Sequence, residues 1–227
     1  MQRFVKRGGN PKPVQIEPLQ PLWIPQPDWA GKTAVVIGTG PSFDVAQARQ
    51  IGLARSRGSI RVLAVNDAAF PAWYADLVFA ADRKWWIARD NLPNFEGIKV
   101  SLSASYWDAP KGVRLIARAG TDGCELRPGS VYTHGHSGAM AVQLAAQMGA
   151  AKIVLVGFDM RPSGQGQAER HFFGGYEDPL GSKPNMAKWV KDFRAIADAM
   201  PGRILNATPG SALDCVPQID LSAAIAH

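Results

Sequence analysis

The sequence lacks several features that would place it in a common class at once. It has only two cysteines in 227 residues, Cys124 and Cys215, and their separation fits no metal-binding spacing. No apolar run approaches the roughly 20 residues that cross a bilayer. The basic start MQRFVKRGGNPKPVQ has no apolar signal-peptide core. We therefore expect a cytoplasmic protein whose cysteines are free thiols.

Familiar catalytic motifs are also missing. There is no G-x-S-x-G nucleophile elbow, no Walker A lysine motif and no paired-cysteine site. Their absence argues against the enzyme classes that depend on these motifs. His134 and His136 lie two positions apart in an expected loop. A zinc ion needs further ligands, and no His or Cys cluster stands nearby in the sequence. The sequence thus gives no positive indication of a metal site there.

The first 30 residues are rich in proline and basic residues. Proline fixes φ and removes a backbone donor, so we expect residues 1–30 to form an extended arm. The chain carries a net charge of +6, and four basic residues lie near its start: Arg3, Lys6, Arg7 and Lys12. This basic arm is either a solvated segment or a contact for a polyanion such as nucleic acid.

Residues 31–227 alternate between apolar strand-like runs and helical segments, which predicts one domain. We expect strands at 33–37, 60–65, 77–80, 98–102, 113–118, 152–156 and 203–205, and helices at 42–55, 68–74, 83–89, 137–148, 184–200 and 218–226. Continuous apolar strands between helices predict a Rossmann-like, doubly wound α/β fold. Its sheet should be mostly parallel, with helices on both faces. A glycine- and proline-rich stretch, 160–183, predicts a lid-like loop.

The first expected strand ends in the turn Gly38-Thr39-Gly40-Pro41-Ser42. Glycines at a strand end let a backbone approach a ligand closely, and the helix that follows offers free N–H groups to a phosphate. The dinucleotide fingerprint needs a third glycine where this chain has Phe43. The turn therefore predicts phosphate or nucleotide binding without the NAD pattern, with a purely structural turn as the alternative.

Other expected strand ends carry polar or small residues too. Because ligands of parallel α/β sheets bind at the carboxyl ends of the strands, these residues should converge on one crevice. Asn66 could read a base or a sugar, and Asp67 could instead cap the next segment. The remaining candidates are Asp82, Ser137, Gly138 and Asp159. In the lid-like loop, His171 could accept a proton from an attacking hydroxyl, and Tyr176 lies close by in sequence.

Five stretches, in this order, resemble a known group of enzymes: IGTGPS, VNDA, VFAADRKWW, HSGAMAVQLAAQMGAAKIVLVGFDM and ILNATPGSAL. The chain resembles bacterial CMP-sialic acid-dependent sialyltransferases and the related archaeal-type 6-hydroxymethylpterin pyrophosphokinase-like proteins. It also looks like proteins often encoded by bacteriophages, which would place it in the host cytoplasm. The resemblance covers most of residues 34 to 213.

The resemblance implies roles for particular residues. By similarity to the sialyltransferases, CMP would be held by Gly38, Gly40, Asn66 and Ser137. His171 would be the general base, and Tyr176 would neutralise the leaving phosphate. The pyrophosphokinase-like branch implies Mg²⁺ held by acidic residues, here Asp67 and Asp82. Thr39, Asp67 and Asp82 depart from the sialyltransferase pattern, which has asparagine or another amide at these places.

Three functional hypotheses follow. The first is a glycosyltransferase that uses a nucleotide-activated sugar of the CMP-sugar type, with His171 as base and no required cofactor. The second is a Mg²⁺-dependent pyrophosphokinase or phosphoryl transferase that uses Asp67 and Asp82. The third is a non-catalytic nucleotide- or DNA-associated phage protein with the basic arm as its anchor.

Overall fold

Eight parallel strands form a single sheet in the computed structural model, which describes residues 21–103, 111–161, 171–173 and 185–226. The strand order is β6-β5-β4-β3-β2-β1-β7-β8. The strands are β1 (Thr33–Ile37), β2 (Ile60–Val65), β3 (Leu77–Phe79), β4 (Ile98–Leu102), β5 (Arg114–Gly120), β6 (Ser130–Tyr132), β7 (Lys152–Val156) and β8 (Ile204–Asn206). The Rossmann-like α/β architecture predicted from the sequence is confirmed.

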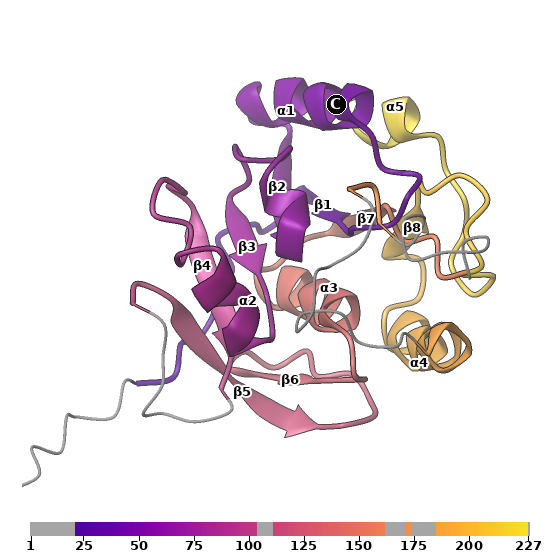
Figure 1. Ribbon diagram of the computed structural model, residues 1–227. Coiled ribbons are helices and arrows are strands. Elements are labelled where there is room, and N and C mark those ends of the chain that lie inside the picture. The colour runs from indigo at the N-terminus through magenta and orange to yellow at the C-terminus, as the bar shows by residue number, and fades with distance from the viewer. Residues whose placement is uncertain (1–20, 104–110, 162–170, 174–184, 227) are drawn as a thin grey trace, which may run out of the picture.

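Helices cover both faces of this sheet (Figure 1). They are α1 (Val45–Ser56), α2 (Arg83–Ala88), α3 (Ser137–Gln147), α4 (Met186–Ala199) and α5 (Leu221–Ala224), with a short 3₁₀ turn η1 at Asn66–Ala69. The core residues of α1, α2 and α5 join one apolar cluster, and those of α3 and α4 join the other. None of the described helices has the length and apolar character that a membrane span requires.

Alternating side chains explain why each inner strand is apolar along its whole length. In β1, Ala34 and Val36 belong to the cluster under α3, whereas Val35 and Ile37 belong to the cluster under α1. All four are fully buried. Because neighbouring side chains of a strand point to opposite faces, a sheet covered on both sides needs apolar residues at every position.

Several element boundaries differ from those expected. Helix α1 begins at Val45, three residues after the expected start, because Asp44 caps it. The Asp44 carboxylate accepts from the Gln47 N–H, and the Asp44 N–H donates to the Gln47 side-chain oxygen. The expected helix at 68–74 is reduced to η1, and α5 is shorter than 218–226. Strand β6 was not predicted, because three residues are too few to show a periodicity.

The last ten residues of the expected arm lie against the body of the protein. Trp29 is 3% exposed, and its N–H donates to the Met148 carbonyl. Ala30 makes an isolated antiparallel bridge with Ala150. The Trp23 N–H donates to the Leu115 carbonyl. Residues 1–20 lie outside the described part of the chain, as does most of the expected lid-like loop.

Candidate functional site at the carboxyl edge of the sheet

The carboxyl ends of β1 and β7 meet at the point where the strand order reverses direction. From β1, the chain runs by way of β2 to the β6 side of the sheet, and then returns through α3 to place β7 on the other side of β1. Ligands of doubly wound sheets bind at such a switch point. Here it is formed by the turn Gly38–Ser42 and the segment Gly157–Asp159.

Gly38 and Gly40, in the turn after β1, are required by close packing within the protein. The Gly40 N–H donates to the Gly157 carbonyl at 2.9 Å. A Cβ on Gly38 would lie 2.6 Å from that same carbonyl oxygen, and a Cβ on Gly40 would lie 1.9 Å from Asp159 Oδ2. These glycines therefore allow the turn after β1 to pack closely against the end of β7. The sequence predicted that they make room for a ligand, but this contact within the protein is sufficient to explain why both positions are glycine.

Asp159 is a buried carboxyl group at the centre of the switch point. Its residue is 6% exposed, and its Oδ2 accepts a hydrogen bond from Ser42 Oγ at 2.9 Å. Burial raises the pKa of Asp159, and the hydrogen bonds from Ser42 oppose part of that rise. A carboxyl group with a raised pKa at a ligand-binding edge is a frequent property of functional sites.

His171 lies on the glycine turn, although 132 residues separate it from its partner there. Its Nδ1 is hydrogen-bonded to Thr39 Oγ1 at 2.9 Å. The N–H of Phe172 donates to the Thr39 carbonyl, and the Phe172 ring packs edge-on against Phe43 at 5.4 Å. Phe43 stands where the dinucleotide fingerprint has its third glycine. Its ring provides the surface against which the segment with His171 packs. Tyr176 lies outside the described residues.

The start of α3 packs against two strand ends. The His136 side chain caps the helix, with Nδ1 accepting from the Ala139 N–H at 3.2 Å. Ser137 Oγ accepts from the Ala81 N–H, after β3, at 3.4 Å. Gly138 allows a close approach to Phe158, because a Cβ there would lie 2.8 Å from its ring.

The end of β2 carries Asn66 and Asp67, which the structure uses differently. Asn66 has a φ of 51°, in the left-handed region, and opens η1. Asp67 is buried, and its two oxygens accept from Arg89 at 2.8 and 3.4 Å. The alternative in which Asp67 caps the following segment is wrong, since η1 has no side-chain cap. Arg89 was not among the predicted residues, because it lies 22 positions from Asp67.

Asp82 lies at the N-cap position of α2 and is exposed, with no side-chain bond to the helix backbone. Among the described residues, neither Asp67 nor Asp82 belongs to a group of three or more His, Cys, Asp or Glu side chains close enough to share a metal ion. Of the two carboxylates that the second hypothesis assigns to Mg²⁺, Asp67 is thus paired with an arginine and Asp82 is exposed to solvent.

No family model matches the chain, and no curated protein matches it in sequence. The fold is similar to that of a known glycosyltransferase. That protein is the MAf glycosyltransferase from Magnetospirillum magneticum AMB-1, with a TM-score of 0.60 and 13% sequence identity. The match covers 89% of this chain and 36% of that one, so this chain spans about a third of the glycosyltransferase's length. The similarity is one of fold, and it does not extend to the sialyltransferase or pyrophosphokinase families.

Proposed function

We propose that this protein is a glycosyltransferase that binds a nucleotide-activated sugar above the carboxyl ends of β1 and β7. The observation that best supports this proposal is the position of His171, hydrogen-bonded to Thr39 in the turn after β1 and therefore beside the switch point. Its imidazole can exchange a proton near neutral pH. The fold shared with the MAf glycosyltransferase supports the same class of reaction.

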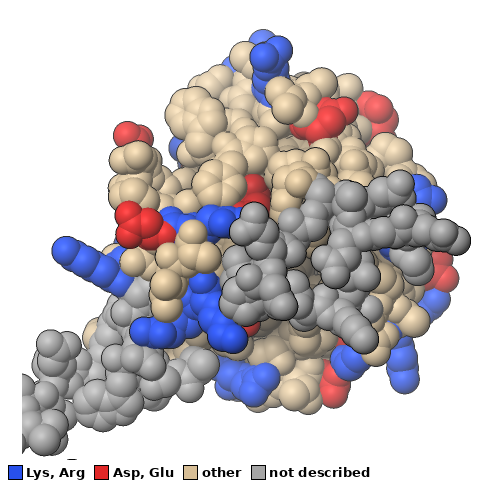
Figure 2. Space-filling view, in the orientation of Figure 1, with Lys and Arg blue, Asp and Glu red and all other residues tan. Residues whose placement is uncertain are grey.

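Basic side chains support the binding of a phosphate-containing donor. Figure 2 shows Lys and Arg gathered over α2, whose first turn carries Arg83 and Lys84. This turn directly follows the carboxyl end of β3, so the positive charge lies on the edge where the donor would bind. Positive charge at a cleft attracts anionic ligands and raises their local concentration.

In the proposed reaction, the acceptor hydroxyl oxygen bonds to the anomeric carbon of the sugar. The bond between that carbon and the phosphate oxygen breaks, and the nucleotide leaves with the electron pair. His171 takes the proton of the acceptor hydroxyl, while Tyr176 would act near the leaving phosphate. The resemblance in sequence makes a CMP-sugar the donor to test first. The Mg²⁺ hypothesis is less favoured, since Arg89 already neutralises Asp67.

A thermal-shift series with nucleotides tests the donor. CMP, UDP, GDP and ATP are each added to the full chain with and without Mg²⁺. We expect CMP to stabilise the fold without metal, by about 2.7 kcal/mol when its concentration is 100 times its dissociation constant. Stabilisation by ATP only in the presence of Mg²⁺ would instead favour phosphoryl transfer with Asp67 and Asp82. Stabilisation by DNA alone would favour the non-catalytic hypothesis.

The His171→Ala variant tests the catalytic base. The assay follows release of CMP from a CMP-sugar with water as acceptor, so no acceptor needs to be known. Removal of a general base typically lowers a rate by about 10²–10⁴, and affinity for CMP should change by no more than a few-fold. Thr39→Val is the matched control, because it removes the partner of His171 and keeps the imidazole. Wild-type turnover by His171→Ala would exclude the proposed role.

A further inference from the structure

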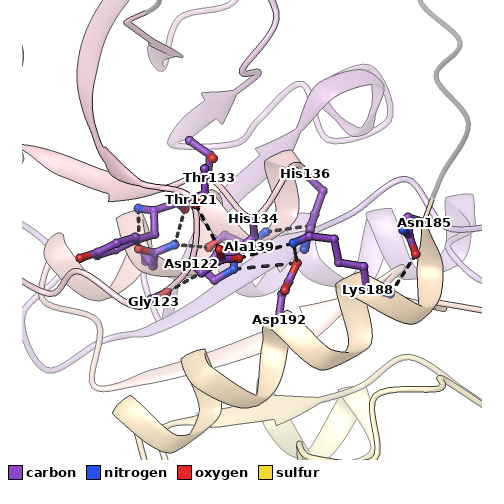
Figure 3. Close-up of polar contacts among 12 residues, drawn as sticks. Thr121, Asp122, Gly123, Thr133, His134, His136, Ala139, Asn185, Lys188 and Asp192 are labelled. Carbon is purple, nitrogen blue, oxygen red and sulfur yellow. Dashed lines mark hydrogen bonds and ion pairs between the residues drawn. The ribbon is translucent and has the colours of Figure 1, made fainter.

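Four charged or titratable side chains meet at a place that the proposed reaction does not use. Asp122 follows β5, His134 follows β6, and Lys188 and Asp192 lie one turn apart on α4. Figure 3 shows these side chains pointing toward one another, from α4 on one side and from the segments after β5 and β6 on the other. Ligand atoms of Asp122, His134 and Asp192 all lie within 4.8 Å of one another. Asp122 is exposed, whereas His134 and Asp192 are buried.

The hydrogen bonding of His134 determines which ring nitrogen carries the proton. Nε2 lies 2.6 Å from the Gly123 carbonyl oxygen. A carbonyl oxygen can only accept, so Nε2 must be the N–H donor. In the neutral ring, Nδ1 then holds a lone pair. Nδ1 is buried, with no hydrogen-bond partner in the described part of the chain, in a residue that is 1% exposed.

A carboxylate faces this lone pair. Asp192 Oδ2 lies 4.0 Å from His134 Nδ1. Two electron-rich atoms that face each other in a buried place call for positive charge between them, either a proton on Nδ1 or a bound metal ion. At 4.0 Å the two atoms are too far apart for a direct hydrogen bond, and this spacing leaves room for an ion. Lys188 supplies one positive charge nearby, with Nζ 2.6 Å from Asp192 Oδ2 and 3.6 Å from Asp122 Oδ1. This ammonium is bonded to the carboxylates and does not satisfy Nδ1.

We propose that Asp122, His134 and Asp192 bind a divalent transition-metal ion of the Zn²⁺ type, with Nδ1 as the histidine ligand. In a tetrahedral zinc site the ligand atoms lie about 3.4 Å apart, since each is about 2.0–2.2 Å from the ion. The exposed side chain of Asp122 can turn toward the ion, and the Asp192 carboxylate must also move a few tenths of an ångström toward His134, since its Oδ2 now lies 4.0 Å from Nδ1. An imidazole ligand selects zinc and its neighbours over Mg²⁺, which prefers oxygen ligands and water.

The surroundings of His134 fit this role. Metal-binding histidines generally donate their second ring N–H to a carbonyl or carboxylate, which fixes the ring and its tautomer. The bond from Nε2 to the Gly123 carbonyl is of this kind. The bound ion would connect α4 to the segments that follow β5 and β6, so it would stabilise the fold. Lys188 competes with the ion for the same carboxylates, because its ammonium already lies 2.6 Å from Asp192 Oδ2 and 3.6 Å from Asp122 Oδ1.

Isothermal titration of the metal-free full chain with ZnCl₂ tests the proposal. We expect one Zn²⁺ per chain and a rise in melting temperature. Asp122→Asn, on an exposed side chain that leaves the fold intact, should weaken Zn²⁺ binding at least about tenfold. Asp192→Asn should do the same, and Lys188→Met should tighten binding by removing the competing cation. Asp198→Asn, the same substitution at an exposed position of α4, is the matched control and should leave binding unchanged.

Cobalt spectroscopy separates this site from the nearby Cys124 thiol. Co²⁺ bound by Asp122, His134 and Asp192 should show no thiolate charge-transfer absorption, and Cys124→Ala should leave its spectrum unchanged. A thiolate band that disappears in Cys124→Ala would overturn the proposal. It would also be overturned if the wild-type chain bound no Zn²⁺, or if Asp122→Asn bound it as tightly as wild type.

Discussion

Asp159 combines two properties that oppose each other in a folded protein. Its carboxyl group is buried, which disfavours its charged form, and it accepts a hydrogen bond from Ser42, which favours that form. Burial dominates, so the pKa is raised. Above its folded pKa, this buried carboxylate therefore lowers the stability of the fold relative to a neutral side chain at the same position.

The pH dependence of stability should reveal this cost. Because the pKa of Asp159 is higher in the folded than in the unfolded chain, the folded chain holds the proton more tightly. Its contribution to stability is therefore greatest below the ordinary value of 3.8 and is lost as the pH rises through the folded pKa. Asp159→Asn, which never ionises and can still accept from Ser42, should raise the melting temperature at neutral pH.

Thermal unfolding between about pH 4 and pH 8 measures this effect. The gap between Asp159→Asn and wild type should widen as the pH rises. Asp28→Asn provides a control, because Asp28 is exposed and the same substitution there should leave the profile unchanged. A lower melting temperature for Asp159→Asn at neutral pH would mean that the ionised carboxylate gains more from Ser42 than it loses by burial.

At the scale of elements, an ion pair joins the turn after β2 to the end of α2. Asp67 lies in η1 and is buried, and Arg89 follows the last turn of α2. Arg89 is also placed over the Phe70 ring, at 5.7 Å. The pair thus fixes two neighbouring segments at the carboxyl edge, where the backbone of Asn66 is in the left-handed region.

Arg89→Met should destabilise the protein more than the loss of a surface ion pair would. The substitution leaves the Asp67 carboxylate buried without its partner, at a cost of about 1–3 kcal/mol. The double variant Asp67→Asn/Arg89→Met should cost less than Arg89→Met alone, because no unpaired charge remains. Urea unfolding of the four proteins in this cycle measures the coupling. Strictly additive effects would show that the two side chains do not depend on each other.

At the scale of the whole molecule, the segment before the first strand is part of the fold. Trp29 belongs to the apolar cluster under α3, and its backbone is bonded to the loop that follows this helix. Residues 21–30 therefore extend the core beyond the β1–β8 sheet. The proline-rich composition predicted their extended backbone, and the structure shows that they attach through the backbones of Trp23 and Trp29.

Substitution of tryptophans tests this contribution. Trp29→Ala should lower the free energy of unfolding by about 3–5 kcal/mol, the usual cost of removing a large buried aromatic side chain. Trp73→Ala is the matched control: its side chain is 75% exposed, so the substitution should have little effect. Denaturation by guanidinium chloride measures both. Equal effects of the two substitutions would mean that Trp29 does not contribute to the core in solution.

The alternation of apolar strands with helices determined the fold class by itself. Apolar residues at every position of a run such as Ala34–Ile37 fit only a strand covered on both faces, so the parallel sheet followed from local pattern. The rule that ligands bind at the carboxyl ends of parallel strands then predicted a ligand site at the turn after Gly38 and at the segment around Asp159. Both predictions could be made from the sequence because each uses only residues that are adjacent in the chain.

Only the tertiary structure decided which of these residues act on one another. Thr39 meets His171 because the Phe172 ring packs against Phe43 beside the glycine turn. Asp67 meets Arg89 because the end of α2 lies beside η1. The spacing of His134 and His136 gave no positive indication of a metal site, since the carboxylates that lie near His134 in the structure, Asp122 and Asp192, come from another strand end and from α4. Contacts of this kind depend on packing between elements far apart in the chain, and no local pattern in the sequence encodes them.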